Sequence, residues 1–302
     1  MRIGTVIVTY NPDNNVLQLI QECISQATQV LVVDNGSNQN DPTILAINDL
    51  LQDHKELKYT SLEKNFGLAF AQNVGIKEFE DLHFDRVVFF DQDSQIPKDF
   101  FESMSRTFDT LLDEGEPVGI LAPNYLDKNI LEYAHFAKLT PNGYQDITLK
   151  SDETAEVSFV ISSGSMMPVA IFKEIGDFNQ EFFIDQVDTE FCLRVLSHGY
   201  KIFATAACTL AHTIGNRTKK RLLFLTIKPN HHSSKRKFYI TRNGVKTMLL
   251  YKEEFPGFRK LMTYRLIHDA MAVVFFEKDK LKKLGAMYQG IRQAYKPYEE
   301  WD

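Results

Sequence analysis

The chain has 302 residues, 44% of them hydrophobic and 25% charged, which is ordinary globular usage and excludes intrinsic disorder. Its three cysteines have no metal-ligand spacing, so we expect free thiols in a reducing compartment. No apolar run approaches the roughly 20 residues that span a bilayer and no signal peptide is recognisable, so we expect a cytoplasmic protein.

Strand and helix patterns alternate through the first half of the chain. Strands are predicted at residues 3–9, 30–33, 57–61, 87–90 and 118–122, and helices at 16–27, 42–51, 68–79 and 98–112. This alternation predicts an α/β fold with parallel strands and crossover helices. Turn residues between positions 123 and 156 predict antiparallel strands or a loop insertion there.

The second half begins with a predicted strand at 157–162 and helices at 170–175 and 187–197. From about residue 217 the pattern becomes mostly helical, with amphipathic stretches at 238–251 and 258–276. The net charge of −6 hides an asymmetry, because residues 1–212 carry −18 and residues 213–302 carry +12. The basic tail is therefore a separate electrostatic region.

Two carboxylates stand at the end of the fourth predicted strand. Asp91 and Asp93 are two residues apart, so in an extended chain they point to the same side. Open α/β sheets bind their ligands at the carboxyl ends of the strands, and paired carboxylates suit Mg²⁺ or Mn²⁺ carrying a diphosphate. The alternative is a polar turn without a ligand.

Further polar or small residues follow the other strands and share this edge of the sheet; they are Thr9, Tyr10, Asn11, Asp34, Asn65 and Gly67. A carboxylate such as Asp34 can accept hydrogen bonds from a nucleobase or a ribose, although an Asx-turn or a helix cap explains it too. Gly67 opens a helix, where a missing side chain lets a ligand approach. A plain helix N-terminus accounts for Gly67 equally well.

Seven blocks in order carry a resemblance to a known family; they are 8–12, 34–37, 65–69, 91–94, 162–164, 183–194 and 212–215. Together, over about residues 3–245, they resemble the family 2 glycosyltransferases of GT-A fold, and more narrowly their bacterial rhamnosyltransferase branch. The resemblance implies a Rossmann-like, mostly parallel sheet and an inverting sugar transfer from a nucleotide diphosphosugar with Mg²⁺ or Mn²⁺. It also implies a catalytic domain at residues 1–215 and a helical basic extension at 216–302.

The resemblance suggests dTDP-β-L-rhamnose as donor, because the Asp91 to Ser94 block and the later Tyr239, Arg242 and Asn243 look like those of rhamnosyltransferases. A UDP-hexose donor is the alternative. The implied donor-binding residues are Thr9, Tyr10, Asn11, Asp34, Asn65, Gly67, Asp91, Gln92, Arg236, Tyr239 and Arg242. The implied metal ligands are Asp91, Asp93 and His212, the last through a neutral imidazole nitrogen.

Matching residues 188–194 onto the family's acidic motif makes Asp188 the expected catalytic base, with Asp185 and Glu190 as rivals. Inverting displacement needs such a base to take the proton of the acceptor hydroxyl. Val187 stands where many relatives carry an acid, which leaves the choice within the cluster open. The alternative without catalysis is an acidic helix N-terminus favoured by the helix dipole.

The expected acceptor is a glycan linked to polyprenyl diphosphate, and the basic tail is expected either to contact an anionic membrane surface or to pack on the acidic domain. If the tail contacts the membrane, we expect the protein to lie peripherally on the inner face of the cell membrane. Nucleic acid is disfavoured as a partner, since the acidic half would repel phosphates. A sugar nucleotidyltransferase and a non-catalytic nucleotide-sugar binder are the rival functions, and the oligomeric state is left open.

Overall fold

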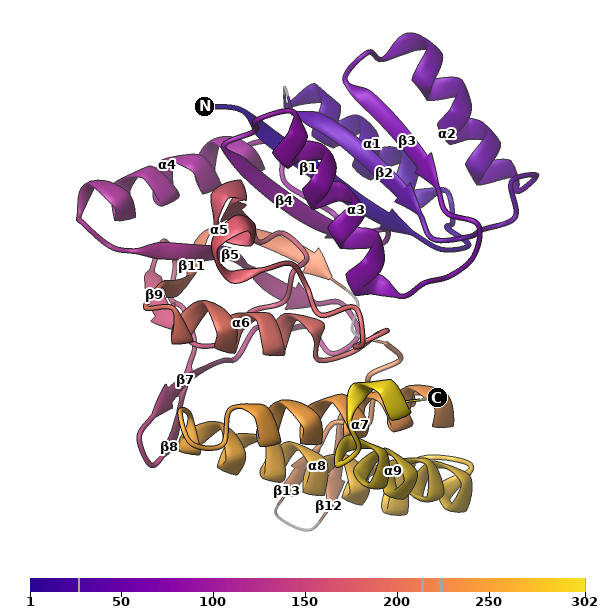
Figure 1. Cartoon of the computed structure of the whole chain (residues 1–302), viewed down its shortest axis with the longest axis vertical. Coiled ribbons are helices and arrows are strands. Elements are labelled where there is room, and N and C mark those ends of the chain that lie inside the picture. Colours follow the sequence, from indigo (N-terminus) through magenta and orange to yellow (C-terminus); the bar gives the residue numbers. More distant parts are fainter. Residues whose placement is uncertain (27, 213–214, 223–224, 302) are drawn as a thin grey trace.

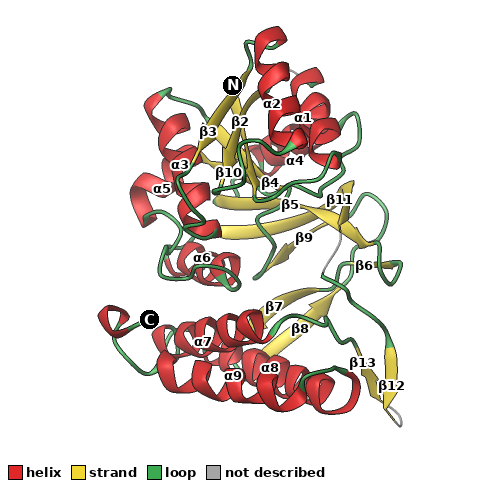
Figure 2. Ribbon diagram, turned by 90° about the vertical axis from the view of Figure 1, so that its right-hand side faces the viewer, coloured by secondary structure: helices red, strands yellow, loops and turns green. Residues whose placement is uncertain are grey.

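A mixed sheet organises the chain, of which the computed structural model describes residues 1–26, 28–212, 215–222 and 225–301. Within these residues the main sheet has nine strands, in the order β3-β2-β1-β4-β10-β5-β11-β9, with β6 paired to β5. Helices cover both faces of this sheet, and three further helices form a separate layer at one end of the molecule (Figures 1 and 2). The predicted α/β fold with a mostly parallel sheet and a helical C-terminal part is confirmed.

The first half of the sheet is parallel and follows the predicted pattern closely. Its strands are β1 (Ile3–Thr9), β2 (Gln29–Asp34), β3 (Leu57–Ser61) and β4 (Arg86–Asp91), and its helices are α1 (Asn15–Ser25), α2 (Pro42–Asp53) and α3 (Leu68–Asp81). Strand β4 is buried on both faces: Val87 and Phe89 face one hydrophobic cluster, and Val88 and Phe90 face the other. A continuous apolar run is what such a strand requires.

The second half of the sheet departs from the prediction at two points. Its elements are α4 (Phe100–Asp113), β5 (Val118–Asp127), β9 (Thr154–Val157), β10 (Met166–Pro168), α5 (Val169–Ile175), α6 (Val187–Ser197) and β11 (Lys201–His212). The strand predicted at 157–162 is wrong, because β9 ends at Val157 and the apolar residues after it are buried in an irregular segment. The three-residue strand β10, antiparallel to β4 and β5, was not predicted and is too short to show a pattern.

The region between β5 and β9 contains antiparallel strands, as expected. They are β6 (Glu132–Tyr133) and the hairpin of β7 (Phe136–Thr140) and β8 (Gly143–Ile147). The hairpin projects from the sheet toward the C-terminal helices (Figure 2). It therefore helps to join the two layers.

The C-terminal region is helical but begins with a hairpin that the sequence did not predict. Its elements are β12 (Lys220–Leu222), β13 (Leu225–Ile227), α7 (Ser234–Leu250), α8 (Pro256–Phe276), α9 (Lys280–Ala294) and the short helix η1 (Tyr298–Glu300). We expected a boundary between two domains at residue 215, and ion pairs from Arg217 to Asp127 and from Lys219 to Glu132 cross it. The division into two domains stays a prediction. Among the described residues, no helix is long and apolar enough to cross a membrane.

Candidate active site

The two carboxylates at the end of β4 lie on a turn that neighbouring strands hold in place. Val8 of β1 is in register with Asp91, and the Tyr10 N–H donates to Gln92 Oε1 at 2.8 Å. The Asp91 N–H donates to Ser163 Oγ at 3.3 Å, and Ser94 Oγ lies 2.7 Å from the same oxygen. Asp91 and Asp93 are half-buried. Within the described part of the chain, no three His, Cys, Asp or Glu side chains gather closely enough to hold a metal by themselves.

Asp34 lies at the same edge, but protein donors already occupy its carboxylate. Thr9 Oγ1 donates to Oδ1 at 3.0 Å, and the Ser37 N–H and Gln39 Nε2 donate to Oδ2 at 2.9 and 3.2 Å. The Ser37 hydroxyl also donates to Oδ1, and the residue is fully buried. In this conformation Asp34 holds the loop after β2 together, through the N–H of a residue three positions on rather than the two positions of an Asx-turn.

The loop that carries Asn65 and Gly67 docks on the chain itself. Asn65 Oδ1 accepts from Asn35 Nδ2 at 3.1 Å and from the Gly67 N–H at 2.9 Å. Gly67 has a φ of +97°, and a Cβ there would lie 2.4 Å from the carbonyl oxygen of Phe183. The missing side chain thus lets the Phe183 backbone approach, and the Leu68 N–H donates to that carbonyl at 2.8 Å.

Asp188 lies in the first turn of α6, directly after a strained segment. Asp185 and Gln186 both have positive φ values, of 65° and 63°, which non-glycine residues rarely adopt outside functional sites. Asp188 Oδ1 is shielded from solvent, and none of the residues that the structure describes forms a hydrogen bond with it. Desolvation and the neighbouring charge of Asp91 raise the pKa of Asp188 to about 7, although hydrogen bonding by Ser162 opposes the rise. The two carboxylates therefore share one site across β4 and α6.

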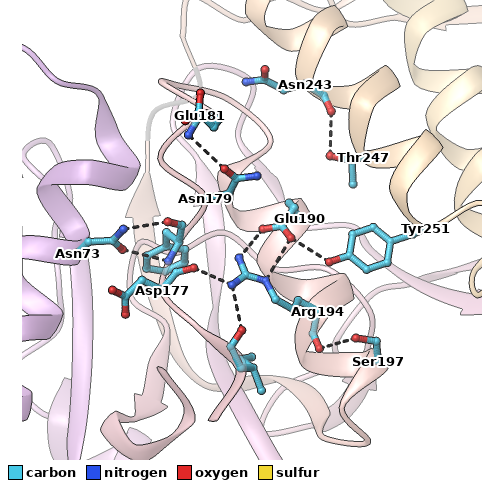
Figure 3. A network of polar contacts seen from close by, with 12 residues as sticks. Asn73, Asp177, Asn179, Glu181, Glu190, Arg194, Ser197, Asn243, Thr247 and Tyr251 are labelled. Carbon is cyan, nitrogen blue, oxygen red and sulfur yellow. Dashed lines mark hydrogen bonds and ion pairs between the residues drawn. The ribbon is translucent and has the colours of Figure 1, made fainter. Parts of the chain in front are cut away.

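The rival bases are engaged in ion pairs. Glu190 is 4% exposed and accepts from Arg194 at 2.6 and 3.2 Å and from the Tyr251 hydroxyl at 2.9 Å (Figure 3). Asp185 accepts on both oxygens from Arg236, at 3.1 to 3.2 Å. Burial raises the pKa of Asp185, and the charge of Arg236 opposes that rise. Of the three acids, Asp188 alone has a shielded oxygen without a partner among the described residues.

Helix α7 clamps the segment before α6, a role that the sequence did not suggest. Asn243 Nδ2 donates to the carbonyls of Ile184 and Asp185 at 2.9 and 3.0 Å, and the Tyr239 ring stacks on Phe183 with centroids 5.5 Å apart. The other clamp residues, Arg236 and Arg242, had been expected like Tyr239 to bind the donor. In this structure all of them contact residues 181–186, and their contact with the donor stays a prediction.

Of the three α7 residues expected to bind the donor, Arg242 is the most enclosed, at 2% exposure. Its Nη2 donates to the Glu181 carbonyl at 3.0 Å, and its guanidinium lies 3.8 Å from the ring centroid of Trp301. Burial lowers the pKa of Arg242 to about 10. A side chain enclosed in this way supports the acidic segment, and its expected contact with the donor stays a prediction.

His212 is the last residue of β11 and pairs with Asp127 of β5. The preceding Ala211 N–H donates to the Gln95 carbonyl at 3.3 Å, which brings this strand end close to the turn of Asp91 and Asp93. The side chain of His212 and the residues at 213–214 lie outside what the structure describes. Its role as a metal ligand therefore stays a prediction.

A cavity of about 710 Å³ adjoins the segment before Asp188. Asp185, Gln186 and Arg236 line one side, and the β5–β6 turn, the β7–β8 hairpin, the β12–β13 hairpin and α8 supply the rest. Four tyrosines face this cavity, namely Tyr125, Tyr133, Tyr144 and Tyr264. The sequence placed three of these tyrosines in the irregular insertion at 123–156 and Tyr264 in the amphipathic stretch at 258–276, and it gave no sign that the two regions meet.

Comparison with known sequences finds one family and two similar proteins. The family model described as Glycosyl transferase family 2 matches residues 5–176. A Shigella flexneri protein named dTDP-rhamnosyl transferase RfbF is 32% identical over 299 residues, covering 96% of this chain and 95% of its own. A Haloferax volcanii protein, low-salt glycan biosynthesis hexosyltransferase Agl10, is 23% identical and covers 71% of this chain and 67% of its own.

Solved structures show the same fold at low sequence identity. GalNAc-T7, solved with UDP, GalNAc and Mn²⁺, gives a TM-score of 0.62 at 11% identity over 97% of this chain and 56% of its own. Residues 1–349 of S. aureus TarS, in complex with UDP-GlcNAc, give 0.57 at 16% identity over 97% and 82%. These likenesses show that the fold is of the GT-A type.

Proposed function

The chain belongs to glycosyltransferase family 2, and from this premise we propose that it transfers L-rhamnose from dTDP-β-L-rhamnose, with inversion, to a hydroxyl of a glycan acceptor. The near full-length similarity to a dTDP-rhamnosyl transferase supports this donor. A UDP-hexose donor is the alternative within the family. The family match disfavours a sugar nucleotidyltransferase, and the retained acids Asp91, Asp93 and Asp188 disfavour a non-catalytic binder.

Asp188 is the proposed general base, and its unpartnered oxygen is the observation that carries the mechanism. A base must accept a proton from the acceptor hydroxyl, so one of its oxygens must be available. Oδ1 of Asp188 meets this condition, whereas the oxygens of Asp185 and Glu190 accept from arginines. Burial is the largest cause that raises the pKa of Asp188, and this cause makes the carboxylate a stronger base whether or not a cation binds beside Asp91. Helix α7 keeps this base in position through its contacts with residues 181–186.

The residues at the end of β4 fit a divalent cation that binds together with a diphosphate. Asp91 and Asp93 offer two hard oxygen ligands from one turn, and the charge of Asp91 already raises the pKa of Asp188, which indicates excess negative charge. Mg²⁺ commonly uses one or two carboxylates and completes its shell with phosphate oxygens and water. When bound, Mg²⁺ or Mn²⁺ would stabilise the charge on the departing nucleotide diphosphate. His212 remains a candidate third ligand.

The nucleotide is proposed to lie along the ends of β1, β2 and β4, in contact with Thr9, Tyr10, Asn11, Asn65 and Gln92. Tyr10 is 47% exposed there and offers an aromatic surface to a base. Asp34 can accept from a base or a ribose only when Gln39 withdraws. Gln39 is an exposed side chain, so its displacement by a ligand costs little.

The cavity beside Asp185 is the proposed acceptor site, and its chemistry suits an uncharged sugar. Three of its cations are already neutralised by carboxylates in its wall; these pairs are Arg217–Asp127, Lys228–Glu132 and Arg236–Asp185. Tyrosine rings can pack against the apolar face of a sugar, and their hydroxyls can bond to its oxygens. We propose that an acceptor linked to polyprenyl diphosphate is presented here, on the inner face of the membrane.

A donor screen tests this proposal. The purified chain is incubated with dTDP-rhamnose, UDP-GlcNAc, UDP-glucose and GDP-mannose in turn, with Mg²⁺ or Mn²⁺, and released nucleotide is measured. We expect dTDP release to be the fastest and to stop in chelator. Faster release from a UDP-sugar would overturn the rhamnose assignment, and release undiminished by chelator would overturn the metal assignment.

A further inference from the structure

Helix α9 exposes a row of large apolar side chains. Leu281, Tyr288, Ile291 and Tyr295 are 87%, 62%, 41% and 67% exposed. Their spacing of seven, three and four residues places them on one face of the helix. Single exposed apolar residues are common, but a continuous row along a helix marks an interaction surface.

The opposite face of α9 is already packed, so the row is not an unfinished part of the core. Met287 and Ala294 are buried against the rest of the helical layer. A Cβ on Gly290 would lie 2.7 Å from the Phe238 carbonyl oxygen of α7, which shows how closely the two helices approach. Helix α9 is thus fixed with its apolar row outward, at the end of the molecule remote from β3 (Figure 1).

The surroundings of the row are strongly basic. Between residues 280 and 296 the sequence contains five Lys and Arg and no Asp or Glu. A groove of about 960 Å³ between α7 and α9 is lined by Lys235, Lys282, Arg292 and Lys296, with no acidic residue among the described residues of its wall. Lys283 does not contribute, because it is buried in an ion pair with Glu277 at 2.7 Å. The cations of this groove are therefore available to an anionic ligand, because no carboxylate in the described wall neutralises them.

We propose that α9 and this groove form a docking face for an anionic phospholipid bilayer. In this arrangement α9 lies in the plane of the interface, its apolar row among the upper acyl chains and its cations on lipid phosphates. A second copy of the chain fits less well. Without the paired Lys283, two α9 helices would still bring four cations against four, with no Asp or Glu in residues 280–296 of either copy to separate them. This proposal depends on the proposed function in one respect, namely that a lipid-linked acceptor requires the enzyme to be at the membrane.

Vesicle sedimentation tests the face. The full chain is mixed with vesicles of phosphatidylcholine alone or with 30% phosphatidylglycerol, at low and high salt, and bound protein is measured. We expect binding only to the anionic vesicles and its loss at high salt, because the attraction acts within a Debye length. Equal binding to both vesicles, or none to either, would overturn the proposal.

Matched variants locate the contact. The double variant Lys282→Gln with Arg292→Gln should weaken vesicle binding about 30-fold, and Leu281→Ser with Tyr288→Ser should weaken it at least 10-fold. Lys173→Gln on α5 and Leu45→Ser on α2 alter exposed residues elsewhere on the surface, and both variants should bind like the parent. Unfolding curves confirm that each variant is folded. If both α9 variants bind anionic vesicles as tightly as the wild type, the proposed docking face is wrong.

Two further readouts separate the proposals. Light scattering reports the mass in solution, and a dimer that becomes a monomer in the Leu281→Ser, Tyr288→Ser variant would show that a second copy covers the row. Donor hydrolysis without vesicles should be unchanged in the α9 variants. A wild-type chain that binds anionic vesicles but releases no nucleotide would leave the docking face standing and overturn the glycosyltransferase mechanism.

Discussion

Replacing Asp188 with Asn should stabilise the metal-free protein at neutral and alkaline pH. The folded chain raises the pKa of this carboxyl from an ordinary 3.8 to about 7, so the native state binds its proton more tightly than the unfolded state. Native stability therefore falls as the pH rises from about 4 to about 7 and stays low above that. At roughly 1.4 kcal/mol per tenfold change in proton affinity, the whole effect is about 4 kcal/mol.

The Asn variant keeps the shape of the side chain and has no charge to desolvate. Between pH 5 and pH 8.5 its advantage over the wild type should grow by about 2–3 kcal/mol, because part of the effect lies below pH 5. Urea unfolding in chelator, followed by circular dichroism at several pH values, measures this difference. Asp49→Asn, an exposed acid on α2, is the control and should show no such trend.

A pH-independent difference between wild type and Asp188→Asn would refute this reasoning. It would mean that the carboxylate is solvated or paired in the native protein. A stabilising substitution that removes activity would instead identify Asp188 as a site where stability is sacrificed for function.

Three other substitutions test the surrounding structure. Asp93→Ala should lower nucleotide release at least 100-fold, while calorimetry still detects nucleotide binding; full turnover would contradict a ligand role. Tyr251→Phe removes the hydroxyl that donates to the buried carboxylate of Glu190 and should lower the unfolding free energy by about 1 kcal/mol, measured in urea. No change would show that this hydrogen bond does not stabilise the fold. Gly67→Ala should lower the unfolding free energy by about 2–4 kcal/mol in the same urea measurement. The control Gly115→Ala should lower it less, because Gly115 shares the positive φ but has open space where a Cβ would lie. Equal losses would exclude the backbone clash at Gly67.

The sequence predicted the parallel half of the sheet well, because its signals are local. A continuous apolar run such as Val87 to Phe90 identifies a strand that is buried on both faces. Strand β10 could not be predicted in this way, since three residues carry no period and its pairing with β4 depends on distant residues. The apolar run after Val157 was wrongly predicted as a strand, because buried apolar residues can also lie in an irregular segment.

At the site, motif matching selected segments that the structure brings together, such as those of Asp91 and Asp188, but it could not give the contacts of their side chains. Motif matching placed Asp188 ahead of Glu190, and the structure adds a physical reason for that order, because Glu190 accepts from Arg194 of α6 and from Tyr251, the C-cap of α7. The resemblance suggested a donor contact for Arg242, and it could not show that this side chain is buried and donates to the Glu181 carbonyl. Such roles depend on which chain segments meet in space.

The central claim is that Asp188 takes the acceptor proton in rhamnose transfer. The most direct test measures dTDP release from dTDP-rhamnose by the wild type, Asp188→Asn and Asp185→Asn, with donor affinity measured in parallel. We expect Asp188→Asn to lose about 100- to 10,000-fold in rate with donor affinity nearly unchanged, and Asp185→Asn to lose less. If Asp188→Asn retains its rate within tenfold while Asp185→Asn is inactive, the base is Asp185 and the mechanism given for Asp188 is wrong.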